Sequence, residues 1–250
     1  MPLTVGDIWW VFPIGITALA LGAIAIAMIP GIRERRRSRR LRRVVPLRGW
    51  SFTESEPALV ERWLHGPFAS GVRHRALHVI TGTADNQPFI AFDLRRSIAV
   101  RNGRKIAYTQ VFAIRLPLAL PTLRMTKVSS GNVVTHALNG GDLLDWPTEP
   151  ASPMDSEAFN NAWEIRGSPG LYLHSFLHPQ MMERLLQPDA REVLVTVEGS
   201  DLHIATPDRL VTFPEFDRYI ALLRDIRDLI PAQVWSDYGR EDASEPVPRF

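Results

Sequence analysis

The chain has 250 residues, 45% of them hydrophobic, and a formal net charge of +2 at pH 7. It contains no cysteine, which excludes disulfide bonds, thiolate metal sites and a cysteine nucleophile. The small net charge hides an uneven distribution, because residues 33–43 hold eight arginines and one glutamate. The rest of the chain is therefore mildly acidic, and we expect no nucleic-acid partner.

Residues 8–29 carry no charge and predict a transmembrane helix. A helix of this length reaches about 33 Å, enough to cross a hydrocarbon core of about 30 Å. Residues 1–7 contain no Lys or Arg, whereas residues 30–46 form an arginine-rich collar. Because Lys and Arg remain on the cytoplasmic side, we expect a single-pass cell-membrane protein with its N-terminus outside and its C-terminal domain in the cytoplasm. The alternative, a cleaved signal peptide, would place the positive charge before the apolar core.

The membrane segment suggests two partners. Small residues recur at spacings of three and four and define one helix face, which favours a homodimer through the span. These residues are Gly15, Ala18, Gly22 and Ala25. The collar favours an anionic inner leaflet, although it can also serve only to fix the topology. Its arginines are Arg33, Arg35, Arg36, Arg37, Arg39, Arg40, Arg42 and Arg43.

Residues 47–138 predict a sheet-rich first half. Thr53 and Glu56 have capping-box spacing and predict a helix that ends before Gly66-Pro67. Beyond it, alternating segments predict strands, with a turn at residues 85–88. Asn102-Gly103 predicts the clearest hairpin, since this pair tolerates the positive φ angles of a tight turn. We expect strands at residues 111–120 and 124–135, with prolines at their ends or edges.

Residues 139–156 predict a surface loop between two halves, because Gly, Pro and acidic residues cluster there. Its acids lack the order of a calcium-binding loop, so a solvated loop is the favoured interpretation. They are Asp142, Asp145, Glu149, Asp155 and, just beyond the loop, Glu157.

Residues 157–238 predict an α+β second half. Short helices are expected at residues 170–176 and 180–186, separated by His178-Pro179. Gly199-Ser200-Asp201 predicts a second hairpin turn. A closing helix follows Thr212 and buries one apolar face, and residues 239–250 predict a disordered tail. That face consists of Phe216, Ile220, Leu223 and Ile230. The fold class is therefore α+β, with one N-terminal transmembrane helix and an antiparallel-sheet-rich domain in two halves.

The second half carries a distinctive succession of apolar residues. It reads Phe159-Asn160-x-x-Trp163-x-Ile165, followed by Leu177-x-Pro179-x-Met181-Met182-x-x-Leu185-Leu186. Together with the span, collar and final helix, this pattern resembles a family of uncharacterised actinobacterial single-pass membrane proteins with a cytoplasmic domain of unknown function. The resemblance implies an anchor plus an α+β domain and implies no activity. His178 departs from the pattern, which has Ser or Thr as the helix cap.

Candidate chemistry is sparse. His174 and His178 are four residues apart and, with Glu183, are weak candidates for a metal site, but Pro179 interrupts their helix. The alternative interpretation is two polar residues near a helix end. His74 and His78 on a predicted strand would stand about 13 Å apart, too far to share a metal. The sequence has no nucleophile elbow, phosphate-binding loop or dinucleotide fingerprint, so we predict no catalytic residue and no cofactor.

The favoured hypothesis is a membrane-anchored, non-enzymatic cytoplasmic adaptor or scaffold for an unknown protein partner. A first alternative is a membrane-tethered sensor domain for a lipid or small molecule. A second alternative is a membrane-bound enzyme whose site gathers His174, His178 and acids of the middle loop.

Overall fold

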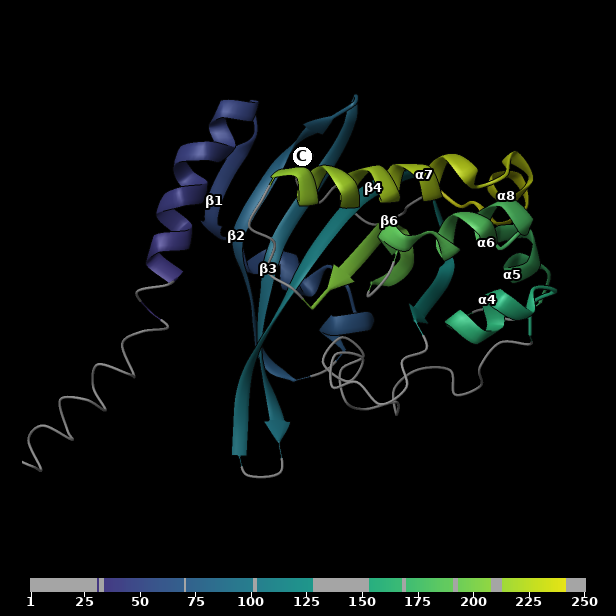
Figure 1. Cartoon of the computed structure of the whole chain (residues 1–250), viewed down its shortest axis with the longest axis horizontal. Coiled ribbons are helices and arrows are strands. Elements are labelled where there is room, and N and C mark those ends of the chain that lie inside the picture. Colours follow the sequence, from purple (N-terminus) through teal and green to yellow (C-terminus); the bar gives the residue numbers. More distant parts are fainter. Residues whose placement is uncertain are drawn as a thin grey trace, which may run out of the picture. The chain divides into compact units, whose positions relative to one another are not determined.

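The computed structural model describes residues 31, 34–69, 71–100, 103–127, 153–167, 170–190, 193–207 and 213–241 (Figure 1). The chain divides into two compact units, Met1–Arg48 and Gly49–Phe250. The predicted span at residues 8–29, its small-residue face and Arg33 lie outside the described residues, as do most of the middle loop and the tail. None of the helices in the described part is both long and apolar enough to cross a bilayer.

In the first unit, the arginine collar forms an α-helix over residues 34–44, drawn in purple in Figure 1. It passes directly into the 3₁₀ helix η1, Val45–Arg48. Arginine is a good helix former, whereas Pro46 lacks the N–H that an α-helix interior needs. The collar was predicted from charge alone, and its helical form is an added result of the structure.

The second unit is built on a six-stranded antiparallel sheet in the order β1-β2-β3-β4-β5, with β6 also paired to β4. The strands are β1 Ser51–Ser55, β2 Val72–Ala84, β3 Gln87–Val100, β4 Gly103–Lys127, β5 Trp163–Gly167 and β6 Leu194–Thr206. Along one edge of β4, β3 pairs with residues 103–114 and β5 takes over at residues 123–127. β6 occupies the other edge. Strands from both sides of residues 139–156 thus share one sheet, so the two predicted halves are not separate layers.

Two predicted turns are confirmed. Ala84 pairs with Gln87 across Asp85 and Asn86, whose φ angles are 47° and 64°. Positive φ at both central residues is the geometry of a type I′ hairpin, which Asp and Asn tolerate. β3 and β4 form the second hairpin, in which Val100 pairs with Gly103.

The two strands predicted at residues 111–120 and 124–135 are partly wrong, because β4 runs on through Lys127 as one 25-residue strand. Its pairing with β6 shifts register between Arg115 and Leu120, where Pro117 lies. Proline has no N–H to give to a ladder, so β4 bulges there instead of ending. Ala119 in this bulge exchanges two 2.9 Å backbone hydrogen bonds with Arg240.

The long helix α7, Phe213–Leu229, covers one face of the sheet (Figure 1). Phe112 of β4 packs edge-on against Phe216 at 5.2 Å and lies 5.4 Å from Tyr219. All four predicted members of the apolar helix face are buried. The prediction is therefore confirmed, except that Pro231 starts a new helix, α8 Ala232–Tyr238, after Ile230.

The opposite face is covered by a short irregular segment with two 3₁₀ helices, η2 Pro57–Glu61 and η3 Gly66–Phe68. Trp63 stacks on Phe92 of β3 at 5.8 Å, and Phe68 lies 5.2 Å from Trp63. Phe92 pairs with Val111, the residue before Phe112, so alternation puts Phe92 and Phe112 on opposite faces. The helix predicted from Thr53 is only partly right, because residues 51–55 pair with β2 as an edge strand and the helical segment that follows is reduced to η2.

Small helices complete the domain: α4 Glu157–Ala162, α5 Leu171–Phe176, α6 Pro179–Leu186 and η5 Pro188–Ala190. The predicted helix at residues 170–176 and the helix start at Pro179 are confirmed. Most apolar residues of the distinctive succession are buried, which makes them packing positions. The buried ones are Phe159, Trp163, Ile165, Leu177, Met181, Met182 and Leu185.

Candidate functional site

A cluster of polar contacts joins residues 62–68, here called the clamp segment, to β6. Pro57 and Pro67 stand in the first turns of the two 3₁₀ helices and favour this compact path. Gly66 has a φ of +67°, which glycine adopts readily. The aromatic rings of the segment enter the core, and its polar groups meet two carboxylates of β6.

Asp201 receives the first half of the clamp segment. The Arg62 guanidinium donates to both carboxylate oxygens, from Nε at 2.6 Å and from Nη2 at 2.7 Å. Trp63 Nε1 donates to the same carboxylate at 3.0 Å. The Arg62 and Asp201 side chains are only 7% and 8% exposed. This two-pronged ion pair is therefore held away from water, where losing one partner is costly.

Glu198 receives the next residues of the segment. Its carboxylate accepts hydrogen bonds from the backbone N–H groups of Leu64 and His65, at 2.8 Å and 3.3 Å. The His65 Nδ1 atom lies 2.8 Å from Oε1, and His203 Nε2 lies 3.8 Å from Oε2. Burial alone would raise the pKa of Glu198, but the two imidazoles and the Leu64 N–H outweigh burial and lower the pKa to about 2. Glu198 is therefore an anion at neutral pH.

A local irregularity in β6 brings the two carboxylates to the same side. Side chains alternate along a strand, so Glu198 and Asp201 would normally point to opposite faces. Gly199 between them has a φ of +58°, and the register with β4 shifts next to it. The hairpin predicted at Gly199-Ser200-Asp201 is therefore wrong, because β6 continues through these residues as one strand. Glycine supplies the turn-like angle without ending the strand.

Arg96 of β3 holds the far end of the clamp segment. It is 1% exposed and donates from Nη1 to the Pro67 carbonyl at 2.7 Å. Burial lowers the pKa of Arg96 to about 10, so it stays charged at neutral pH. Charged groups thus pin both ends of the segment, while the Leu64 side chain remains 72% exposed. The arrangement positions a surface segment, and it keeps the Glu198 carboxylate of β6 ionised near neutral pH.

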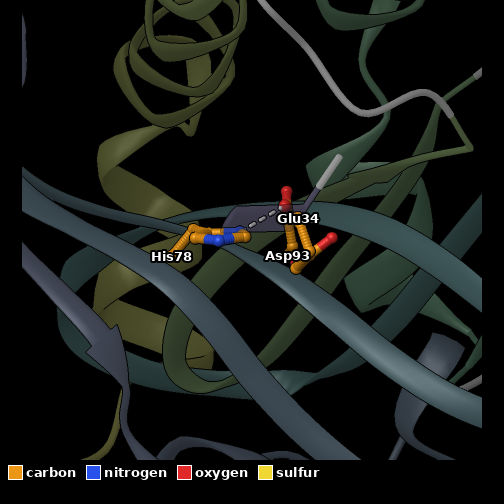
Figure 2. Close-up of side chains that lie close together, drawn as sticks. All are labelled: Glu34, His78 and Asp93. Carbon is orange, nitrogen blue, oxygen red and sulfur yellow. Dashed lines mark hydrogen bonds and ion pairs between the residues drawn. The ribbon is translucent and has the colours of Figure 1, made fainter. Parts of the chain in front are cut away.

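A second buried polar pair joins β2 and β3. His78 Nδ1 lies 3.0 Å from Asp93 Oδ2, and Figure 2 shows the imidazole beside this carboxylate. The His78 backbone has a φ of 51° at a shift in the β2–β3 register. Phe52 stacks on the His78 ring at 6.2 Å. Strand alternation alone, which related His78 to His74, gives no indication of Asp93 on the neighbouring strand.

The predicted metal candidates do not converge. His174 and Glu183 are exposed on different helices, α5 and α6. The His178 Nε2 atom lies 2.8 Å from the Leu229 carbonyl oxygen, which ties the start of α6 to the end of α7. Among the described residues, these three side chains form no group with ligand-atom spacing. Of the acids named around the middle loop, only Asp155 and Glu157 are described.

The collar arginines are arranged with a marked face. Arg36, Arg39, Arg40 and Arg43 lie together along the helix over residues 34–44. Spacings of three and four residues place side chains on the same helix face. Here that face is a stripe of guanidinium groups, suited to contact with phosphate groups.

No family model matches the chain, and no curated protein matches it. Among solved structures, it is similar to the crystal structure of the mycobacterial trehalose monomycolate transport factor A, TtfA. The two superpose with a TM-score of 0.54 and 11% sequence identity, over 85% of this chain and 98% of that one. At this identity the similarity establishes a shared fold.

Proposed function

We propose that this chain is a non-enzymatic adaptor of membrane lipid transport. In this proposal residues 8–29 anchor it in the cell membrane, and the collar stripe faces the anionic inner leaflet. The α+β domain then works on the cytoplasmic side by holding a protein partner. The observation that carries the proposal is the fold shared with a transport factor across 85% of the chain.

The geometry of the clamp segment and of the two carboxylates that hold it, here called the clamp carboxylates, supports a binding role over a catalytic role. Both clamp carboxylates are engaged by several donors, and Glu198 has a pKa of about 2, far from that of a general acid or base near neutral pH. Such a network stabilises one backbone path and presents Leu64 to the surface. Rigid presentation of an apolar side chain is what a docking surface needs, because less conformational freedom is lost on binding.

Photocrosslinking in native membranes tests the adaptor proposal. In the full-length chain, a photoreactive phenylalanine is placed at Leu64 in one variant and at Leu171 in another. Leu171 lies on α5 and is 79% exposed. We expect irradiation of the intact membranes of the native host to give a discrete crosslink to a membrane transport protein, identified by mass spectrometry. Unirradiated samples are the control. If neither position yields a protein crosslink, the adaptor proposal is wrong.

A further inference from the structure

The far end of the sheet carries a cationic surface that the adaptor proposal leaves unused. β2 pairs with β3 as far as Val72 and Ser97, and β3 and β4 continue beyond as a two-stranded ribbon. Figure 1 shows this ribbon projecting at the bottom of the view. We call the surface formed by Val72, Arg75, Arg95, Arg104 and Ile106 the basic sheet end.

Strand register puts these five side chains on one face. Arg75 pairs with Arg95, and Val72 pairs with Ser97, which in turn pairs with Ile106. Residues directly opposite each other in an antiparallel sheet share a face. Arg104 belongs to the same face, since its Nε atom donates to the Ser97 hydroxyl at 3.2 Å. Cations and aliphatic side chains therefore alternate across three neighbouring strands.

The described residues of the domain leave the two opposed arginines of the basic sheet end without an acidic partner. In the part of the chain that the structure describes, no acidic group pairs with Arg75 or Arg95, although the two like charges lie directly opposite each other. Like charges in that position destabilise a sheet. Residues 94–141 contain no Asp or Glu at all, whereas the chain beyond the collar is acidic overall. The part of this stretch that forms the basic sheet end, residues 94–109 of β3 and β4, thus carries basic residues and no acid, in a domain that is acidic overall.

The apolar residues of the basic sheet end indicate which kind of anionic surface it would bind. Val72 is 44% exposed and Ile106 is 46% exposed, in the same row as Ser97 and next to the arginines. Exposed aliphatic groups interleaved with cations are typical of surfaces that insert into the headgroup region of an anionic bilayer. The acidic remainder of the domain would be repelled by such a membrane. The basic sheet end is therefore the part of the domain that suits the bilayer.

We propose that the basic sheet end is a second membrane-contact site, which binds anionic phospholipid headgroups and orients the domain on the bilayer. The inference rests on the proposed function only in assuming that the anchor keeps the domain beside a membrane. Electrostatic attraction brings the arginines to the headgroups, and Ile106 and Val72 enter the interface. An acidic protein surface is the competing occupant.

A single fluorescent label tests this contact in the full-length protein. Because the chain has no cysteine, Ile106→Cys creates a unique site for an environment-sensitive nitrobenzoxadiazole label. The labelled chain is reconstituted into phosphatidylcholine vesicles with or without phosphatidylglycerol. We expect a blue shift, and quenching by nitroxide-bearing lipids, only when phosphatidylglycerol is present, and both should be lost in high salt. Leu171→Cys on α5 carries the same label as the positional control.

Charge variants in the labelled background identify the binding groups. Arg75→Gln, Arg95→Gln and Arg104→Gln together should abolish the shift. The control replaces three arginines of α7 by Gln, namely Arg218, Arg224 and Arg227. It changes the net charge by the same amount and should leave the fluorescence shift intact.

Three results would overturn the proposal: no shift in either vesicle, equal shifts at positions 106 and 171, or a shift that appears only after acidic protein is added. The comparison of the two vesicle types needs no variant beyond the label, so misfolding of the Gln variants cannot hide the answer. If the fluorescence shift is absent but the photocrosslinks to a protein are obtained, only the membrane contact is refuted. If the shift is present but no protein crosslink is obtained, only the adaptor proposal is refuted.

Discussion

At the scale of single residues, the clamp segment and its two carboxylates bring together side chains that no sequence motif connects. Arg62 and Asp201 are 139 positions apart, and neither belongs to a recognisable motif. Glu198 would be assigned to the wrong face by alternation, because the effect of Gly199 on β6 appears only once the strand is paired. The His174–His178 spacing, which was visible in the sequence, leads to no shared site.

Asp201→Asn should destabilise the domain strongly. The change leaves the Arg62 guanidinium buried without its full charge partner, which costs about 3 kcal/mol for a buried pair. For a domain of this size, that corresponds to a fall in Tm on the order of 10 °C. Circular dichroism of the detergent-solubilised chain during heating measures it.

The matched control for Asp201→Asn is Asp85→Asn, which removes the carboxylate paired with Arg224 on the surface. The Asp85 side chain is 77% exposed, and Asn keeps the turn geometry, so we expect a loss below about 1 kcal/mol. Equal effects of the two substitutions would contradict a buried clamp.

Because of Glu198, the unfolding free energy of the domain should depend on pH in the acidic range. Its pKa falls from an ordinary value of 4.5 to about 2 on folding. The stabilisation is therefore complete above pH 4.5 and disappears as the pH falls through 4.5 towards 2. We expect the difference in unfolding free energy between wild type and Glu198→Gln to shrink by up to about 3 kcal/mol over this interval. Urea titrations at a series of pH values measure the difference.

Glu183→Gln is the control for the acid dependence, because it removes an exposed carboxylate on α6. Its difference from wild type should stay nearly constant over the same pH range. A constant difference for Glu198→Gln as well would show that the clamp carboxylate does not couple folding to protons.

At the scale of elements, β4 and β6 are the strands that local signals describe least well. Pro117 predicts an interruption, yet β4 absorbs it as a bulge whose Ala119 backbone pairs with Arg240. Gly199 predicts a turn, yet β6 continues because β4 satisfies its backbone on both sides of the glycine. Turns whose flanking strands pair with each other, as at Asp85-Asn86, are predicted correctly.

Gly199→Ala should weaken β6 without a steric clash. Beyond the adjacent residues of the chain, no atom lies within 4 Å of the position that a Cβ would occupy, so the expected loss, about 1 kcal/mol, comes from the φ of +58° alone. Gly199→Asn should lose less, because Asn tolerates this region better than Ala. Chemical denaturation of the three proteins compares them. If Ala and Asn cost the same, backbone strain is not the cause.

At the scale of the whole molecule, the proposed orientation in the membrane rests on the charge distribution. In this proposal the collar stays in the cytoplasm and holds the domain there. The shared fold with a transport factor and the basic sheet end both concern the domain that this orientation would place at the inner leaflet.

Cysteine labelling of the full-length chain tests the orientation. Thr4→Cys and Leu171→Cys each introduce the one thiol of an otherwise cysteine-free protein. In intact cells, a membrane-impermeant maleimide should modify position 4 and spare position 171, and permeabilised cells should show both. Labelling of position 171 in intact cells would show that the domain lies outside and would contradict the proposed orientation.

The sequence by itself determined the properties that depend on neighbouring residues. These are the uncharged stretch with its basic collar, the absence of cysteine, the tight turns with residues that accept positive φ, and the apolar face of α7. Tertiary structure alone decided which distant groups meet. The clamp, the His78–Asp93 pair and the basic sheet end all depend on strand register and on bulges, which are set by long-range pairing and packing. A shift of one residue reverses the face of every side chain that follows, so local pattern cannot specify such sites.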